Sequence, residues 1–183
     1  FSLDTSKASK AKGVVKIFVG TDMEVGSIPC GWQVDSKDGT PMREPAHPPI
    51  AKDKVRYVGE IIAVIIAESL EDAKNAAELV DVNYEDIPVI IDMQDALDNS
   101  KGLVHDEIES NVCYDWELGD SEAVDKAISE AAHITSLDIR NNRLIPNAME
   151  TRSAIGDYEH ATGQYTLYTT SQNPHVIRLL MGA

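Results

Sequence analysis

The stretch that decides the fold is KVRYVGEIIAVIIAESLEDAKNAAELVDVNYEDIPVIID, residues 54–92. Within it, a nearly continuous run of β-branched residues in Val55–Ala67 predicts a strand that is buried on both faces. Ser69 then stands at a helix N-cap, with Asp72 three residues later as a weaker form of the capping box. Small apolar residues follow at helical spacing, and Val80–Tyr84 returns to the period of a strand. The stretch therefore predicts a strand–helix–strand unit.

The residues before this unit predict a strand and a long loop. Gly13–Val19 alternates apolar residues on one face and is typical of a strand. Thr21–Pro49 is interrupted by glycine and proline throughout, and so long a structureless stretch is unusual in a compact domain. We therefore expect Thr21–Pro49 to be a functional or docking loop.

The residues after the unit change from a helical pattern to a strand pattern near residue 133. A short helix over 92–99 and an irregular stretch over 103–118 precede a helix that begins after Asp120 and runs through Ala132. Three strands then follow, at Ile134–Arg140, Arg152–Tyr158 and Tyr165–Ser171. We expect an α+β protein with one domain over residues 1–133 and a second over 134–183.

The last of these strands leads directly into a helix, in the stretch LYTTSQNPHVIR (Leu167–Arg178). Asn173 is a good N-cap, and Pro174 suits the first helical position. Gln172 therefore lies where backbone donors converge at a helix N-terminus, which is a favourable place for an anionic or oxo-bearing ligand. Because a helix of about two turns is marginal alone, we expect the native sequence to continue beyond Ala183.

Composition excludes several classes of function. Sixteen Lys and Arg against 31 Asp and Glu give a formal charge of −15, which argues against nucleic-acid or anionic-membrane partners. No apolar run is long enough to span a bilayer and no signal peptide is visible. Cys30 and Cys113 belong to no CxxC pair, so this chain alone builds no cysteine-ligated iron–sulfur cluster. A single disulfide stays open, but two scattered cysteines favour a reduced, cytoplasmic protein.

Several blocks in order resemble one family. They resemble the molybdenum-binding large subunit of the xanthine dehydrogenase and aldehyde oxidase family. The blocks are the opening LDTSKASKAKGVVKIFVGTDM (3–23), the 54–92 block, His105, Asn111 and the Gly119–Asp120 pair, RLIPNAMETRSAI (143–155) and LYTTSQNPHVIR. The aerobic carbon monoxide dehydrogenase type is the most similar branch. The resemblance implies an α/β hammerhead domain over 1–133, followed by the first strands of a molybdopterin-binding domain over 134–183.

The resemblance implies a molybdenum hydroxylase with a molybdenum–molybdopterin cofactor. FAD and 2Fe-2S clusters are then expected on a medium and a small partner subunit, in a homo-oligomer of the heteromeric unit. The substrate is a small molecule, and carbon monoxide, purines, aldehydes and N-heterocycles all stay open. The catalytic glutamate and the loop that carries a copper-ligating cysteine would follow residue 183, so we expect the 183 residues alone to be inactive.

Gln172 is the only site residue that the resemblance assigns, as a hydrogen-bond donor to an oxo ligand of the molybdenum centre. No catalytic and no metal-ligating residue is expected in this chain. Glu150 beside Arg152 is typical of an ion pair, and structural roles are favoured for Arg143, Arg152 and His175. The histidines are isolated, without HExxH spacing, which argues against a protein-ligated zinc or iron site.

Two alternatives stay open from the sequence. The first is a free-standing hammerhead module that acts in docking or assembly without a cofactor, which the acidic surface and the Thr21–Pro49 loop would suit. The second is a split gene, in which another chain completes the cofactor domain. An open reading frame of several hundred codons beyond Ala183, with a glycine-rich cofactor loop and a late glutamate, would instead make the chain a fragment of a molybdenum hydroxylase.

Overall fold

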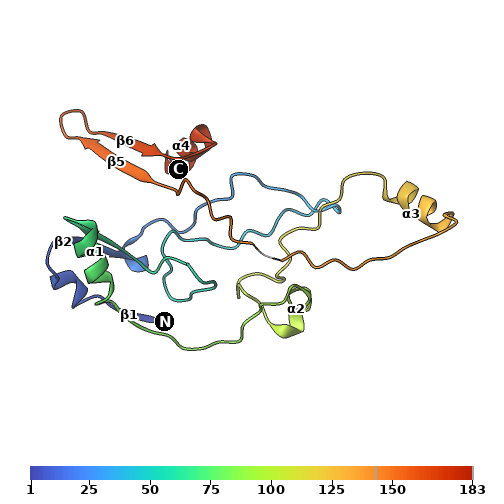
Figure 1. Ribbon diagram of the computed structural model, residues 1–183, viewed down its shortest axis with the longest axis horizontal. Helices are drawn as coiled ribbons and strands as arrows, with labels where there is room; N and C mark the ends of the chain where they lie inside the picture. Colours follow the sequence, from blue (N-terminus) through green and yellow to red (C-terminus); the bar gives the residue numbers. More distant parts are fainter. Residues whose placement is uncertain (143, 183) are drawn as a thin grey trace. The chain divides into compact units, whose positions relative to one another are not determined.

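The computed structural model describes residues 1–142 and 144–182, which form two compact units, Phe1–Glu117 and Leu118–Ala183. The fold is α+β, with short helices and three two-stranded antiparallel sheets among the described residues (Figure 1). No helix in these two ranges is long and apolar enough to cross a membrane.

The first unit is built on two strand pairs and one helix. Strand β2 (Val14–Val19) pairs antiparallel with β3 (Ala63–Ala67), and β1 (Ser2–Asp4) pairs antiparallel with β4 (Asp81–Asn83). Helix α1 (Leu70–Ala77) connects β3 to β4 and packs against β3, β2 and the 3-10 helix η1 (Ala8–Lys10). A second 3-10 turn, η2 (Gly20–Asp22), follows β2. The predicted strand–helix–strand order is confirmed, but its two strands belong to different sheets.

The start of α1 follows from its cap. The hydroxyl of Ser69 accepts a hydrogen bond from the Asp72 N–H at 3.1 Å, and donates to the Asp72 carboxylate at 2.6 Å. These bonds stabilise the first turn, as the sequence predicted. Ala76 is fully buried on the side of α1 that meets the strands.

The prediction of one long strand over Val55–Ala67, buried on both faces, was wrong. Only Ala63–Ala67 is a strand, because residues 56–60 turn, with Gly59 at a φ of 98° and the Glu60 N–H donating to the Tyr57 carbonyl. Within β3, Val64 and Ile66 are 40% and 45% exposed, whereas Ala63, Ile65 and Ala67 are half-buried. Helix α1 covers one face of β3, and β2 is its one paired strand among the described residues. The other face of β3 is therefore left uncovered by these residues.

An irregular linker completes the first unit. Helix α2 (Met93–Leu97) begins after Asp92, whose carboxylate accepts from the Gln94 N–H at 2.8 Å, and a 3-10 turn η3 (Asn99–Lys101) follows. The predicted short helix over 92–99 is thus confirmed in a shorter form. Residues 102–117 form neither helix nor strand, as expected.

The second unit contains two helices and a hairpin. Helix α3 (Ser121–Ser129) is capped by Asp120, whose carboxylate accepts from the Ala123 N–H, and it ends three residues before the predicted Ala132. Strand β5 (Ala154–Glu159) pairs antiparallel with β6 (Gln164–Thr169) through a turn with Gly163 at a φ of 71°. Helix α4 (Pro174–Gly182) follows. These elements confirm the predicted helix, the last two strands and the terminal helix.

The predicted strand Ile134–Arg140 is not formed. Ile134, Leu137 and Ile139 are 62–79% exposed, and no strand among the described residues pairs with this segment. A strand requires a neighbour for its backbone N–H and C=O groups. Apolar and polar residues do alternate in this segment, but none of the described residues forms a strand beside it.

Burial in the described residues is sparse. Only Ala8, Ile50, Ala51 and Ala76 are buried apolar residues, and the accessible surface is 15,644 Å². Two separate globular domains of these sizes would expose about 10,400 Å². About 5,000 Å² of surface therefore lacks the covering that a folded domain of this size normally has.

Candidate functional site

Gln172 lies in the bend between β6 and α4. The Thr170 N–H donates to the Ser153 carbonyl at 3.3 Å, which keeps the end of β6 beside the start of β5. The Asn173 N–H donates to the Ser171 hydroxyl at 2.9 Å, and the first helical hydrogen bond of α4 runs from the Ile177 N–H to the Asn173 carbonyl. The strand-to-helix turn predicted from the sequence is therefore formed around Gln172.

The carboxamide of Gln172 has no partner among the described residues. Its side chain is exposed. The first turn of α4 adds N–H groups that have no acceptor within the helix, and the helix N-terminus carries a partial positive charge. An amide donor in such a place can stabilise negative charge on an oxo group without protonating it. The donor chemistry thus fits an oxo-bearing group.

The other residues considered from the sequence show no catalytic arrangement. Glu150 and Arg152 are both exposed, and the described residues contain no ion pair between them, so the predicted pairing is not formed. His175 lies in the first turn of α4 on an exposed face, in keeping with a helix-surface histidine. Arg143 lies outside the described residues. No group of three His, Cys, Asp or Glu among the described residues could hold a metal ion.

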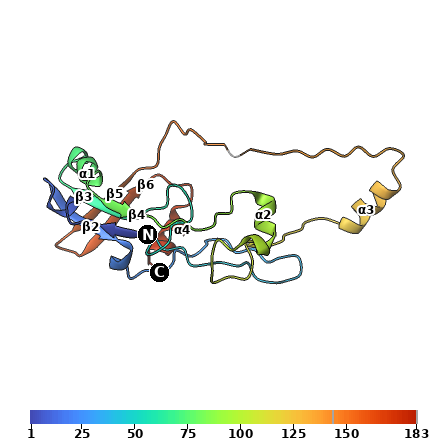
Figure 2. The same cartoon turned by 90° about the horizontal axis from the view of Figure 1, so that it is seen from below.

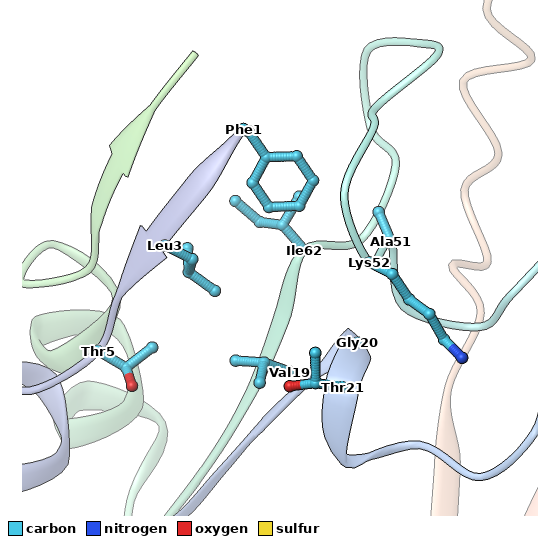
Figure 3. Close-up of a pocket in the computed structure, with 9 residues that line it drawn as sticks. All are labelled: Phe1, Leu3, Thr5, Val19, Gly20, Thr21, Ala51, Lys52 and Ile62. Carbon is cyan, nitrogen blue, oxygen red and sulfur yellow. The ribbon is translucent and has the colours of Figure 1, made fainter. Parts of the chain in front are cut away.

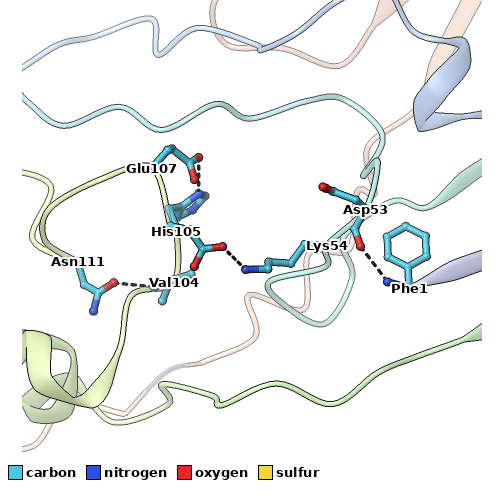
Figure 4. A network of polar contacts seen from close by, with 8 residues as sticks. Phe1, Asp53, Lys54, Val104, His105, Glu107 and Asn111 are labelled. Atoms are coloured by element: carbon cyan, nitrogen blue, oxygen red, sulfur yellow. Dashed lines mark hydrogen bonds and ion pairs between the residues drawn. The ribbon is translucent and has the colours of Figure 1, made fainter.

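A polar network in the first unit joins residues 53–54 to residues 104–111 (Figure 4). The Lys54 ammonium donates to the Asp106 carboxylate, and the Phe1 amino group donates to the Asp53 carbonyl at 2.8 Å. His105 Nδ1 lies 3.4 Å from Glu107 Oε1. The hydrogen bond from Lys54, reinforced by its charge, holds the pKa of Asp106 below its ordinary value. The network therefore ties the linker to the strand pairs.

Asn111 organises the linker from the same network. Its side-chain oxygen accepts from the Val104 N–H at 2.8 Å, and its amide group donates to the carbonyls of Gly102 at 2.9 Å and Ala96 at 3.3 Å. One part-buried side chain thus satisfies three backbone groups of an irregular segment. His105 and Asn111, which the sequence resemblance singled out, are structural residues of this linker.

A small cavity of about 230 Å³ lies between β1, β2 and the segment at residues 51–52 (Figure 3). Phe1 lies beside Ile62, and the side chains of Leu3 and Val19 face the same space. Gly20 is required at its edge, because a Cβ there would lie 2.3 Å from the Ala51 carbonyl oxygen. The lining carries no carboxylate, histidine or cysteine, so the cavity is a packing feature of the fold.

Comparison with known families identifies the family to which this fold and this site belong. Residues 1–88 match the family described as aldehyde oxidase and xanthine dehydrogenase, a/b hammerhead domain, and residues 104–183 match the molybdopterin cofactor-binding domain. The chain belongs to the xanthine dehydrogenase and aldehyde oxidase family. The strand pairs, α1 and the cavity therefore belong to its hammerhead domain, and Gln172 lies within the part matched to the cofactor-binding domain.

Individual relatives of this family match over nearly the whole chain. The nicotine 6-hydroxylase large subunit of Paenarthrobacter nicotinovorans is 29% identical over 98% of this chain and 21% of its own length. The carbon monoxide dehydrogenase large chain of Afipia carboxidovorans is 27% identical over 98% of this chain and 23% of its own. The crystal structure of quinoline 2-oxidoreductase from Pseudomonas putida 86 superposes with a TM-score of 0.80, at 27% identity, over 99% of this chain and 22% of that one. The chain thus spans about a fifth of the length of these relatives.

Sequence reasoning missed the contacts that hold the linker in place. The Lys54–Asp106 pair joins residues 52 positions apart, and the sequence carries no signal that would match these two among so many charges. The family resemblance named Asn111 but not its role, which could have been suspected because Asn side chains often satisfy backbone groups in irregular segments. The three backbone groups that its side chain contacts, however, come together only when the linker folds.

Proposed function

We propose that this chain is part of the molybdenum-binding subunit of a molybdenum hydroxylase. The single observation that carries the proposal is the order of the two family matches, hammerhead domain then molybdopterin cofactor-binding domain, over 168 of the 183 residues. When bound, a molybdenum–molybdopterin cofactor supplies the redox chemistry of hydroxylation. The chain itself supplies binding and orientation.

Gln172 is the residue that acts on the cofactor in this proposal. Its exposed carboxamide donates a hydrogen bond to an oxo group, and the N-terminus of α4 adds a favourable field for negative charge. None of the described residues takes the role of general base. The 183 residues alone are therefore expected to be catalytically inert, and measurable turnover by this chain alone would contradict that part of the proposal.

The proposal extends to the assembly. Some of the relatives are named as large chains or large subunits, and one is named as a complex subunit gamma. We assign FAD to a medium subunit and 2Fe-2S clusters to a small subunit, in a cytoplasmic enzyme that forms a homo-oligomer of the heteromeric unit. The hammerhead domain ends near residue 133 and the cofactor domain begins at residue 134. The substrate is a small molecule of the carbon monoxide, purine, aldehyde or N-heterocycle type.

The experiment compares Gln172→Ala with Gln164→Ala in the complete gene product. Gln164 is the matched control, because it is a glutamine at the opposite end of β6. Loss of one donor to a group that develops charge lowers turnover by about 100-fold, whereas molybdenum content stays unchanged. Equal turnover in the two variants, with molybdenum present, would contradict the role of Gln172 and leave the family assignment intact.

A further inference from the structure

The bend that carries Gln172 is held by hydroxyl groups on both sides. It lies between β6 and α4, which follow one another directly in the chain (Figures 1 and 2). On the helix side, the Ser171 hydroxyl accepts from the Asn173 N–H at 2.9 Å. On the strand side, two threonines contact Ser153, which stands just before β5. Ser153 belongs to the 143–155 block, to which the proposed function assigns no role.

Three hydrogen bonds join the end of β6 to Ser153. The Thr170 N–H donates to the Ser153 carbonyl at 3.3 Å, and the Thr169 hydroxyl donates to the same carbonyl at 3.2 Å. The Ser153 N–H donates to the Thr170 hydroxyl at 3.3 Å. The sequence blocks 143–155 and 167–178 therefore meet at the point where the strand ends and the bend begins.

The bond to the Thr170 hydroxyl ends the pairing of β5 with β6. Ala154 pairs with Thr169, so Ser153 lies opposite Thr170 in the register. A hydrogen-bonded antiparallel pair exchanges two backbone bonds, in which each N–H donates to the carbonyl opposite. Here only the Thr170 N–H does so, and the hydroxyl of Thr170 takes the place of its own carbonyl as acceptor. The second backbone bond is replaced, and β6 ends at Thr169, just before the bend that carries Gln172.

We propose that Thr170 is a positioning residue for Gln172, acting through its hydroxyl. Valine has the shape of threonine but no acceptor, and it favours strands. In Thr170→Val, the Ser153 N–H would take the Thr170 carbonyl as its acceptor, which lengthens β6 and shifts the bend. The carboxamide of Gln172 would then donate in a different direction. The inference rests on the proposed role of Gln172, and it adds a residue that affects the cofactor only through Gln172.

A double-mutant cycle in the complete gene product tests the inference. Thr170→Val is expected to lower kcat about 10-fold at unchanged KM, since a misplacement of about 1 Å can cost about 100-fold. Thr170→Ser keeps the hydroxyl and should restore turnover. In a Gln172→Ala background, Thr170→Val should cause no further loss, because residues that act through one another are not additive. An equal additional loss in that background overturns the inference.

Two measurements besides turnover separate positioning from damage to the fold. The electron paramagnetic resonance signal of the bound molybdenum should change in Thr170→Val as it does in Gln172→Ala, at wild-type molybdenum content. The amides of β5 and β6 should exchange no faster than in the wild type. Faster exchange or loss of molybdenum in Thr170→Val would indicate a structural role and overturns the inference.

Thr166→Val is the matched control for these measurements. Thr166 lies in β6, and its hydroxyl forms no hydrogen bond with another described residue. This variant should therefore keep the turnover, the resonance signal and the amide exchange of the wild type. A loss of turnover in Thr166→Val as large as in Thr170→Val would show that any such change in β6 has this effect, which overturns the inference.

The outcomes also distinguish this inference from the proposed function. Loss of turnover in Gln172→Ala, together with wild-type turnover in Thr170→Val, overturns the inference alone. Unchanged turnover in Gln172→Ala would refute the proposed role of Gln172, and the inference would fail with it. A correctly folded product without molybdenum would refute the proposed function and the inference together.

Discussion

Replacing Gly20 by alanine is expected to destabilise the hammerhead domain through one contact. An added Cβ would lie 2.3 Å from the Ala51 carbonyl oxygen and 2.8 Å from the Lys52 Cα, and real Cβ contacts essentially never fall below 3.0 Å. The two backbone segments must separate by at least 0.7 Å. Ala51 is buried, and its N–H donates to the Ile61 carbonyl at 2.8 Å, so the segment cannot move without disturbing the residues before β3.

The cost of such overpacking is about 2 kcal/mol. Hydrogen exchange followed by mass spectrometry measures it locally: amides of β2 and β3 should exchange about 30-fold faster. Gly26→Ala is the matched control, because a Cβ there meets nothing within 4 Å and the residue has an ordinary φ. Equal exchange in the two variants would refute the claim that the 19–21 and 51–52 segments are in close backbone contact.

Three further changes test the local structure of the first unit. Ser69→Ala removes the cap of α1 and should cost about 1 kcal/mol, seen as faster exchange of the α1 amides. Asn111→Ala leaves three backbone groups of the linker without their partner and should cost about 2 kcal/mol in urea unfolding. Because Lys54 lowers the folded-state pKa of Asp106, the stabilisation from this pair is complete above pH 3.8 and is lost as the pH falls through the folded-state value. The urea midpoint should therefore fall more steeply toward pH 3 in the wild type than in Asp106→Asn.

Each of these changes has its own control or contradiction. Ser2→Ala and Asn75→Ala remove exposed side chains of the same types and should be close to neutral. If Asn111→Ala were as mild as Asn75→Ala, the linker would not depend on the side chain of Asn111. Parallel pH profiles for the wild type and Asp106→Asn would show that the ion pair contributes nothing to stability.

The sequence predicted local features well because their causes are local. The caps at Ser69 and Asp120 and the helix start at Pro174 each depend on a side chain within three residues of the backbone group that it serves. The strand-to-helix turn that holds Gln172 is predictable for the same reason. Its proposed role came from the family resemblance, and it stays a prediction.

What the sequence could not predict depends on distant partners. Ile134–Arg140 has the composition of a strand, but pairing requires a neighbour that apolar alternation cannot name. The order in the Thr21–Pro49 loop comes from Cys113 and Asp115, about 70 residues away. The burial of β3 was overestimated because β-branched content does not reveal how many faces of a strand are covered.

The most direct test of the central claim is the molybdenum content of the complete gene product, measured by inductively coupled plasma mass spectrometry in a host that loads a control molybdenum hydroxylase. The account predicts about one molybdenum per subunit, released together with the pterin on denaturation. A correctly folded product without molybdenum or pterin, from a host in which the control is loaded, would contradict the assignment and favour a docking module without a cofactor.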